Sequence, residues 1–268
     1  SSEHYKNLIY ELNNNKGFTS LEFRKEMSRI AFADIAYYDS LITNYFNNFC
    51  KVNFPEKKIF HGNLIEKLRY GENPHQESAI YSKNNKLELK QLHGKRLSYN
   101  NYNDIFVALT ISKSLPKNKG TVIIKHANPC GISIKENKTE SFKSAFLCDP
   151  ISAFGGIVSC NFKITKKLAL ELNKIFLEVV IANDFEKDAL KILKLKKNLR
   201  IIDSKNFILN ETLKFISNND SLLVQSEDND YFSKKNFKVV SKKKPNRSQL
   251  ENLIFAFNIC RYVKSNAI

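Results

Sequence analysis

Residues 69–76 read RYGENPHQ and concentrate more reactive groups than a surface turn requires. They include a guanidinium at Arg69, a phenol at Tyr70, a carboxylate at Glu72 and an imidazole at His75. The glycine and the Asn-Pro pair of this segment indicate a turn, because glycine permits positive φ and proline disfavours helix in the residue before it. From these residues alone, a ligand-binding loop and a purely structural turn are both open interpretations.

A second concentration of reactive groups is KHANPCG, residues 125–131, which follows the apolar strand pattern TVII. Neighbouring residues of a strand point to opposite faces, so Lys125 and His126 can share a site only where the strand ends. We expect Asn128-Pro129 to end it there. An imidazole at such a position can accept a proton near neutral pH. The alternative is a core histidine bonded to backbone, beside a lysine whose amine reaches solvent.

Two cofactor signatures are only partly matched. Gly155 and Gly156 precede a strand pattern rather than a helix, so they predict neither a dinucleotide fingerprint nor a P-loop. The segment around His126 resembles part of the zinc deaminase signature. However, Asn128 stands where that signature needs glutamate, and Ser133 stands where it needs the second cysteine. We therefore expect no metal site.

The composition favours a globular chain from a reducing compartment. Its 268 residues are 42% hydrophobic, which suffices for one large core or two modest ones. The five cysteines are odd in number and form no C-x-x-C pair, so we expect neither disulfides nor structural zinc, and a cytoplasmic location. No apolar run approaches the roughly 18 residues that a membrane span needs, and no signal peptide is visible, so we expect no membrane partner.

The net charge of +16 raises the alternative of a basic α/β module that binds nucleotides or nucleic acid without catalysis. The lysines are spread along the whole chain and asparagine is also frequent, which indicates a compositional bias rather than a binding face. We therefore expect no nucleic-acid partner, whereas a small anionic substrate would suit the charge.

Hydrophobic periodicity predicts an α/β fold after a helical start. Residues 1–50 show helical spacing, with a break at Gly17 and Thr19 as the expected N-cap of the second helix. From about residue 60, apolar runs alternate with helical patterns, which predicts a sheet covered on both faces. The expected strands are 121–125, 156–162, 178–182 and 199–203, and the expected helices are 103–115, 141–148, 165–176 and 185–198. Three apolar runs after residue 204 suggest a small antiparallel addition, and residues 247–266 predict a final helix.

Six segments occur in an order that points to one family. They are LRYGENPHQ, HGKRLSYNNYND, IIKHANPCG, CDPISAFGGIVS, LEVVIA and FAFNICRYVKSNAI. Together they resemble the bifunctional purine-synthesis proteins that are both AICAR transformylase and IMP cyclohydrolase. AICAR is 5-aminoimidazole-4-carboxamide ribonucleotide. The resemblance covers nearly the whole chain.

The resemblance implies a domain organisation. Residues 1–55 would be the helical tail of the cyclohydrolase region and its link. Residues 56–245 would form the first half of the transformylase, a three-layer α/β domain resembling cytidine deaminase but without zinc. Residues 246–268 would lead into the second half, so the chain is expected to be a piece of a longer polypeptide.

The resemblance also implies residue roles. Lys125 and His126 match a catalytic pair, in which the histidine helps to deprotonate the 5-amino group of AICAR as it attacks the formyl carbon of 10-formyltetrahydrofolate. The lysine would assist proton transfer or stabilise developing charge. Asn266 matches an asparagine that orients the formyl group. The implied substrate-binding residues are Arg69, Tyr70, Asn101, His126, Gly155 and Glu178.

The same resemblance implies a homodimer with formyl-transfer sites at the subunit interface, and a folate pocket supplied mostly by the part beyond residue 268. The front of the cyclohydrolase domain is absent from the chain, so we do not assign that activity to it. We expect the isolated chain to show little or no formyl transfer, because catalysis needs the complete set of groups at near-attack geometry.

Overall fold

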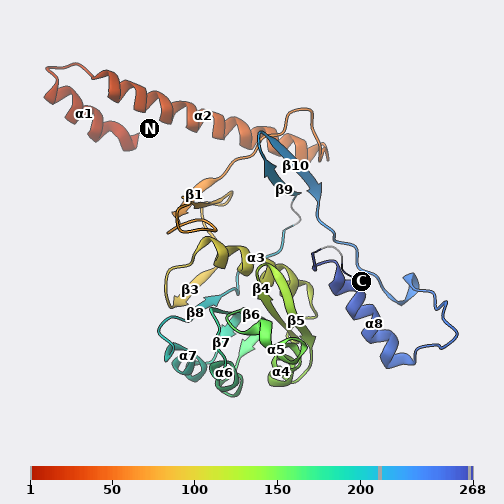
Figure 1. Ribbon diagram of the computed structural model, residues 1–268. Coiled ribbons are helices and arrows are strands. Elements are labelled where there is room, and N and C mark those ends of the chain that lie inside the picture. Colours follow the sequence, from red (N-terminus) through yellow and green to blue (C-terminus); the bar gives the residue numbers. More distant parts are fainter. Residues whose placement is uncertain (1, 211–212, 265–266, 268) are drawn as a thin grey trace. The chain divides into compact units, whose positions relative to one another are not determined.

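The computed structural model describes residues 2–210, 213–264 and 267, and the chain divides into two compact units (Figure 1). The first unit comprises Ser1–Ile65 and Tyr81–Lys86, and the second comprises Glu66–Ile80 and Leu87–Ile268. The domain boundaries expected at residues 55 and 245 stay a prediction.

The first unit begins with two helices, as its apolar spacing predicts. A short 3-10 turn, η1 (Ser2–His4), leads into α1 (Tyr5–Asn14), and α2 (Leu21–Phe49) follows. The N-cap of α2 is Ser20, whose side chain accepts from the Phe23 amide, so the expected cap at Thr19 is wrong by one residue.

Short strands follow the helices. β1 (Asn63–Lys67) and β2 (Ala79–Ser82) form a two-stranded sheet. Within the first unit, the Asn63 amide donates to the Tyr37 hydroxyl over 2.6 Å and anchors the start of β1 to α2. These strands have only four or five residues and lack a clear alternation of apolar and polar side chains, so the sequence did not predict them.

The second unit is built on a mixed sheet. Among the described residues, six strands pair in the order β3-β8-β7-β6-β4-β5. Their bounds are β3 Lys90–His93, β4 Gly120–Lys125, β5 Asn128–Ile134, β6 Ile157–Ile164, β7 Val179–Phe185 and β8 Arg200–Asp203. β6, β7 and β8 run parallel, whereas β4 is antiparallel to both of its neighbours and β3 is antiparallel to β8.

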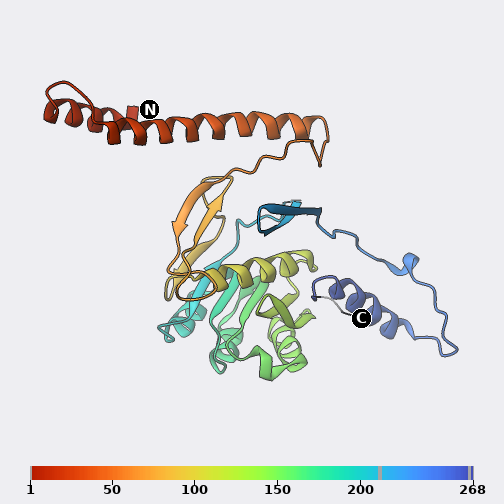
Figure 2. The ribbon, with the colours of Figure 1, turned by 45° about the horizontal axis from the view of Figure 1, so that its top comes forward.

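Helices cover both faces of this sheet, in agreement with the sequence prediction. One face carries α3 (Tyr99–Ser114), the yellow-green helix that lies over the sheet in Figure 2. The other helices are α4 (Lys138–Cys148), α5 (Pro150–Ala153), α6 (Lys166–Asn173) and α7 (Lys187–Lys194), which pack on the second core. The predicted α/β class is therefore confirmed.

The apolar run of β4 shows why the alternation of strands and helices could be predicted from the sequence. Val122 and Ile124 face the core beneath α3, whereas Ile123 faces the core on the other side. All three side chains are at most 1% exposed, because a central strand is buried on both faces and becomes a continuous apolar run.

Two of the boundaries that differ from the sequence prediction lie beside the candidate residues. α3 begins at Tyr99 rather than residue 103, because Ser98 and Asn101 form a capping box that the first turn requires. The strand before KHANPCG is not ended by Asn128-Pro129. The chain turns at His126 and Ala127, and Asn128 already begins β5, an edge strand in which a proline is tolerated.

The C-terminal part contains a hairpin and a helix. β9 (Leu213–Asn218) and β10 (Ser221–Ser226) pair antiparallel, as expected, but residues 237–240 are not a strand and follow a short 3-10 turn, η2 (Lys234–Asn236). α8 (Arg247–Cys260) is capped by Asn246 and is shorter than predicted. No described helix is both long enough and apolar enough to span a membrane.

Candidate active site

The predicted site residues gather at one edge of the six-stranded sheet. β4 ends there, and β6, β7 and β8 begin there, because Ile124 pairs with Ile157 in antiparallel register and β6 to β8 run parallel. The usual ligand position in an α/β sheet is at the carboxyl ends of parallel strands. This edge is instead the amino end of the three parallel strands β6, β7 and β8, and the carboxyl end of β4 and β3, which run antiparallel to them.

The turn between β4 and β5 holds His126. Both central residues of this two-residue turn, His126 and Ala127, have positive φ values of 54° and 55°. This is the φ pattern of a type I′ hairpin turn, which normally selects Asn and Gly. The His126 side chain is exposed, and the Ala127 amide donates to Asp104 Oδ1 over 2.6 Å. The turn therefore presents the imidazole to solvent while α3 holds its backbone.

Lys125 extends from the last position of β4 toward the segment before β6. Its Nζ donates to the carbonyl of Phe154 over 2.8 Å. Next to that carbonyl, Gly155 has a φ of +74° and its amide donates to the Phe176 carbonyl over 2.9 Å. Since few side chains tolerate that φ, a glycine suits this position.

Glu178 stands immediately before β7 and connects three elements. Its Oε2 accepts from the Asn101 side-chain amide over 2.8 Å and lies 3.5 Å from Arg200 Nη1. The Glu178 amide donates to the Gly156 carbonyl over 3.0 Å, which ties the carboxylate to the start of β6. The Glu178 side chain is 43% exposed, so it keeps access to solvent despite these contacts.

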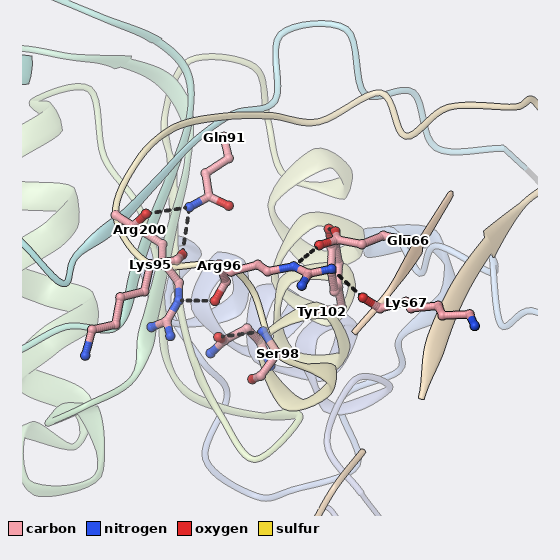
Figure 3. Close-up of polar contacts among 10 residues, drawn as sticks. Glu66, Lys67, Gln91, Lys95, Arg96, Ser98, Tyr102 and Arg200 are labelled. Carbon is pink, nitrogen blue, oxygen red and sulfur yellow. Dashed lines mark hydrogen bonds and ion pairs between the residues drawn. The ribbon is translucent and has the colours of Figure 1, made fainter. Parts of the chain in front are cut away.

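A cluster of polar contacts around Arg96 fixes the approach to α3 (Figure 3). The Arg96 guanidinium donates to the Glu66 carboxylate and to the Lys67 carbonyl at the end of β1. Arg200 Nε donates to the Arg96 carbonyl over 3.4 Å, and the Tyr102 hydroxyl donates to Glu66 over 3.4 Å. These contacts join the end of β1, the start of α3 and the start of β8.

The RYGENPHQ loop follows directly after β1. The Gly71 amide donates to the Gln76 carbonyl over 2.7 Å, which closes the loop as a turn. The loop reaches α3 through Asn100, whose side chain donates to the Glu72 carbonyl over 3.2 Å. The Arg69 guanidinium lies over the neighbouring Tyr70 ring at 5.3 Å. The loop that carries Arg69 and Tyr70 is therefore hydrogen-bonded to the N-terminal end of α3, where Asn101 also lies.

Burial changes the acidity of two groups on α3. Partial burial raises the pKa of Asp104, and the amides of Ala127 and His126 act in the opposite direction. Burial, together with the Glu66 charge, raises the pKa of Tyr102 to about 12. Tyr102 is therefore a hydrogen-bond donor at physiological pH rather than a base.

The structure thus brings five predicted residues to one sheet edge, and the predicted loop residues Arg69 and Tyr70 to the adjoining helix end. The five are Lys125, His126, Asn101, Gly155 and Glu178. Asn266 lies outside the described residues. Within the described part of the chain, no cluster of three or more His, Cys, Asp or Glu side chains could hold a metal ion.

Sequence reasoning missed Asp104 and Arg200. Asp104 lies three residues after Asn101, so the two share one face of a helix. Arg200 is the one basic residue in the short buried strand pattern LRIID, and a charged side chain in a buried strand is normally paired with another polar or charged group. These signals could have found both residues, but only after the helix and strand had been placed.

Comparison with known proteins decides the family. The model of the family described as "AICARFT/IMPCHase bienzyme" matches residues 1–268. The chain belongs to this family. It is 44% identical over 257 residues to the "Bifunctional purine biosynthesis protein PurH" of Thermoanaerobacter sp. (strain X514), covering 94% of this chain and 50% of that protein.

Other members of the AICARFT/IMPCHase family give the same picture. The chain is 42% identical to the protein of that name from Leptospira biflexa, covering 98% of this chain and 52% of the relative. With the Bradyrhizobium diazoefficiens protein it is 39% identical, covering 100% of this chain and 52% of the relative. The chain therefore spans about half the length of the curated relatives that it matches.

Proposed function

We propose that the chain is part of an enzyme that transfers the formyl group of 10-formyltetrahydrofolate to the 5-amino group of AICAR in purine synthesis. The observation that carries this proposal is the placement of an exposed histidine, His126, at the same sheet edge as the Asn101–Glu178 pair. Family membership and the name shared by its relatives support it.

In the proposed reaction, the 5-amino nitrogen attacks the formyl carbon. His126 accepts a proton from that amine as the new C–N bond forms. The bond between the formyl carbon and N10 of the folate then breaks, and N10 leaves with a proton. Lys125 stabilises the oxyanion or returns the proton, and its bond to the Phe154 carbonyl directs the ammonium along this edge. The product is the formamido nucleotide.

The proposed nucleotide contacts come from the surrounding elements. Arg69 offers a guanidinium, which suits a phosphate, and Tyr70 offers a phenol. Glu178 is a hydrogen-bond acceptor held in place by Asn101, and it suits hydroxyl or amine donors of the nucleotide. Gly155 allows the ligand to approach the backbone closely.

Other parts of the proposal concern the longer protein. Asn266 would orient the formyl group, and the folate would bind mainly to the part beyond residue 268. We also propose a cytoplasmic homodimer, a zinc-free domain of cytidine-deaminase type, and closure of the product to IMP by a cyclohydrolase region elsewhere in the longer protein.

Calorimetric titration of AICAR, at low and at moderate salt, tests the nucleotide site. We expect saturable binding with mild salt dependence, and at least about fivefold weaker binding by His126→Ala, because one hydrogen bond at a site contributes of order 1 kcal/mol or more. His4→Ala, in the first unit, is the control for loss of an imidazole and should bind as the unchanged chain does.

Two results would contradict the proposal. One is binding of any polyanion with an affinity that falls steeply with salt, as a basic nucleic-acid module would show. The other is a failure to bind millimolar AICAR both by this chain and by the chain extended with the C-terminal half of a relative.

A further inference from the structure

We propose that Asp104 is a positioning residue that fixes the His126–Ala127 turn and thereby aims the imidazole of His126. The proposal rests on the proposed function only in taking His126 as the proton acceptor. The hydrogen bond to the turn itself is independent of what the site binds.

The turn is the kind of backbone that needs support. His126 and Ala127 both lie in the left-handed region, at φ 54° and 55°. An alanine has no side chain that can bond its own backbone there, and the left-handed conformation is unfavourable for residues with a Cβ atom. Such conformations persist where the surrounding structure holds them.

Asp104 supplies that support from α3. Its Oδ1 accepts the Ala127 amide over 2.6 Å, a short bond of the kind that a carboxylate makes with a backbone amide. The helix that carries Asp104 is anchored in the core, since Ile105 and Ala108, which follow Asp104 within about one helical turn, are fully buried. The Asp104 carboxylate is therefore held in place by its helix, and its hydrogen bond fixes the position of the turn.

The position of Asp104 on α3 argues against a role limited to stabilising the helix itself. Ser98 is the N-cap of α3, so Asp104 is the sixth helical residue. An acidic residue benefits from the helix dipole and from capping only within about the first turn. The helix therefore gains little from Asp104, whereas the turn gains a hydrogen bond.

Asp104 shares one face of α3 with a second residue that contacts the sheet. Asn101, one helical turn earlier, binds Glu178 at the start of β7. One face of α3 thus holds the end of β4 through Asp104 and the start of β7 through Asn101. The ionisable groups that act on Asp104 are His126 and Glu178. The spacing of the imidazole and the Glu178 carboxylate is then set by two side chains of one rigid helix.

A first test uses amide and imidazole NMR spectra of the whole chain without ligand. In Asp104→Ala the Ala127 amide proton should move upfield and the His126 ring signals should shift, because the acceptor is lost. Asp104→Asn should restore part of both shifts, since its carbonyl oxygen can still accept. Asp203→Ala is the control, because Asp203 also accepts one backbone amide, from Lys205 over 2.8 Å, and belongs to the opposite end of β8. An Ala127 amide signal that stays in place in Asp104→Ala would overturn the proposal.

A second test uses AICAR affinity. Asp104→Ala should weaken binding by roughly tenfold or more, the loss expected for one charge-assisted hydrogen bond that sets a site. Ala127→Gly added to Asp104→Ala should recover most of the affinity, because glycine adopts this φ without support. In a His126→Ala background, Asp104→Ala should change the affinity little, because its effect passes through the imidazole.

The two tests separate the two proposals. If the unchanged chain and its extended form bind no AICAR, the proposed function fails, and the NMR spectra still decide whether Asp104 holds the turn. If AICAR binds but Asp104→Ala weakens it equally with and without His126, Asp104 acts on general structure and the positioning role is wrong. Should Asp104→Ala fail to fold, Asp104→Asn and the Ala127→Gly double variant provide the same comparison.

Discussion

The side-chain amide of Asn101 donates to the carboxylate of Glu178 over 2.8 Å, although the two residues are 77 positions apart in the sequence. The same asparagine closes the capping box of α3 by accepting the Ser98 amide. Asn101 is 5% exposed, so its side chain makes both hydrogen bonds from a buried position. One buried side chain therefore sets both where the helix begins and where the carboxylate before β7 stands.

Asn101→Ala should lower both stability and nucleotide affinity. The variant loses half of a capping box and a hydrogen bond to a charged group, which together correspond to about 1–3 kcal/mol of unfolding free energy. The proposed AICAR binding should also weaken, because Glu178 is no longer held. Urea denaturation and calorimetric titration measure the two effects.

Gln249→Ala is the matched control for that variant. Gln249 closes the capping box of α8 in the same way but lies on an exposed helix start. It should lose about 0.5–1 kcal/mol and leave AICAR affinity unchanged. Equal losses of stability and affinity in the two variants would show that the bond to Glu178 contributes nothing.

Gly131→Ala should be severely destabilising. A Cβ atom at Gly131 would lie 1.9 Å from the Ala145 carbonyl oxygen, so β5 and α4 would have to separate. Overpacking of this kind costs about 1–3 kcal/mol or more. The control is Gly17→Ala, which meets no atom within 4 Å and should cost only about 1 kcal/mol for its φ of +87°. Thermal unfolding that ranks Gly17→Ala as the worse variant would contradict the close packing of β5 on α4.

The five cysteines should react with a thiol reagent in an order set by their burial. Cys50 and Cys148 are exposed and should be labelled first. Cys160 is buried, and burial raises its pKa to about 12, so it should stay unlabelled until the chain unfolds. Burial, and then the Asp149 charge, also raises the pKa of Cys130, which should react slowly. Mass spectrometry of peptides after timed labelling checks the order, and early labelling of Cys160 would contradict the fold.

Lys113 should affect stability in a pH-dependent way. Its ammonium donates to Asn183 Oδ1 and to the Ser204 carbonyl, and burial lowers its pKa below the ordinary 10.5, with Asp203 acting in the opposite direction. The folded chain therefore binds this proton less tightly than the unfolded chain does. Stability attributable to Lys113 should rise as pH increases from its lowered pKa to about 10.5.

The comparison with Lys113→Met measures this effect. The difference in unfolding free energy between the unchanged chain and Lys113→Met should become more favourable to the lysine between pH 7 and pH 10. Lys191→Met, which removes an exposed lysine paired with Asp188, controls for the loss of one charge. A difference that is the same at both pH values for Lys113→Met would show that the ammonium is not desolvated by folding.

The sequence predicted the alternation of strands and helices because the central strands are buried on both faces. Val179, Val180 and Ile181 are all fully buried, and such runs are visible without any knowledge of their neighbours. It did not predict β5, since Asn128-Pro129 resembles a strand terminator and only the edge position of β5 makes the proline acceptable. Position in the sheet is a property of the whole fold.

The candidate site was predictable in its residue types but not in its geometry. Lys125 and His126 are conspicuous in KHANPCG, and the structure places them at the end of β4 and in the turn that follows it. The direction of β4 relative to β6 leaves no local mark in the sequence, so the sheet edge at which the site lies could not be derived. Asp104 was passed over for a similar reason, because its partner, the Ala127 amide, is 23 residues away.

The antiparallel placement of β4 between β5 and β6 has a consequence for the order in which the native structure forms during folding. The β4–β5 hairpin closes through two residues and needs no distant partner, so the histidine turn can form early in folding. The carboxylate before β7 reaches α3 only after the chain has closed a loop of 77 residues, a slower event. The proposed nucleotide binding should therefore be the last property to return during refolding, after the hairpin and its helix are already native.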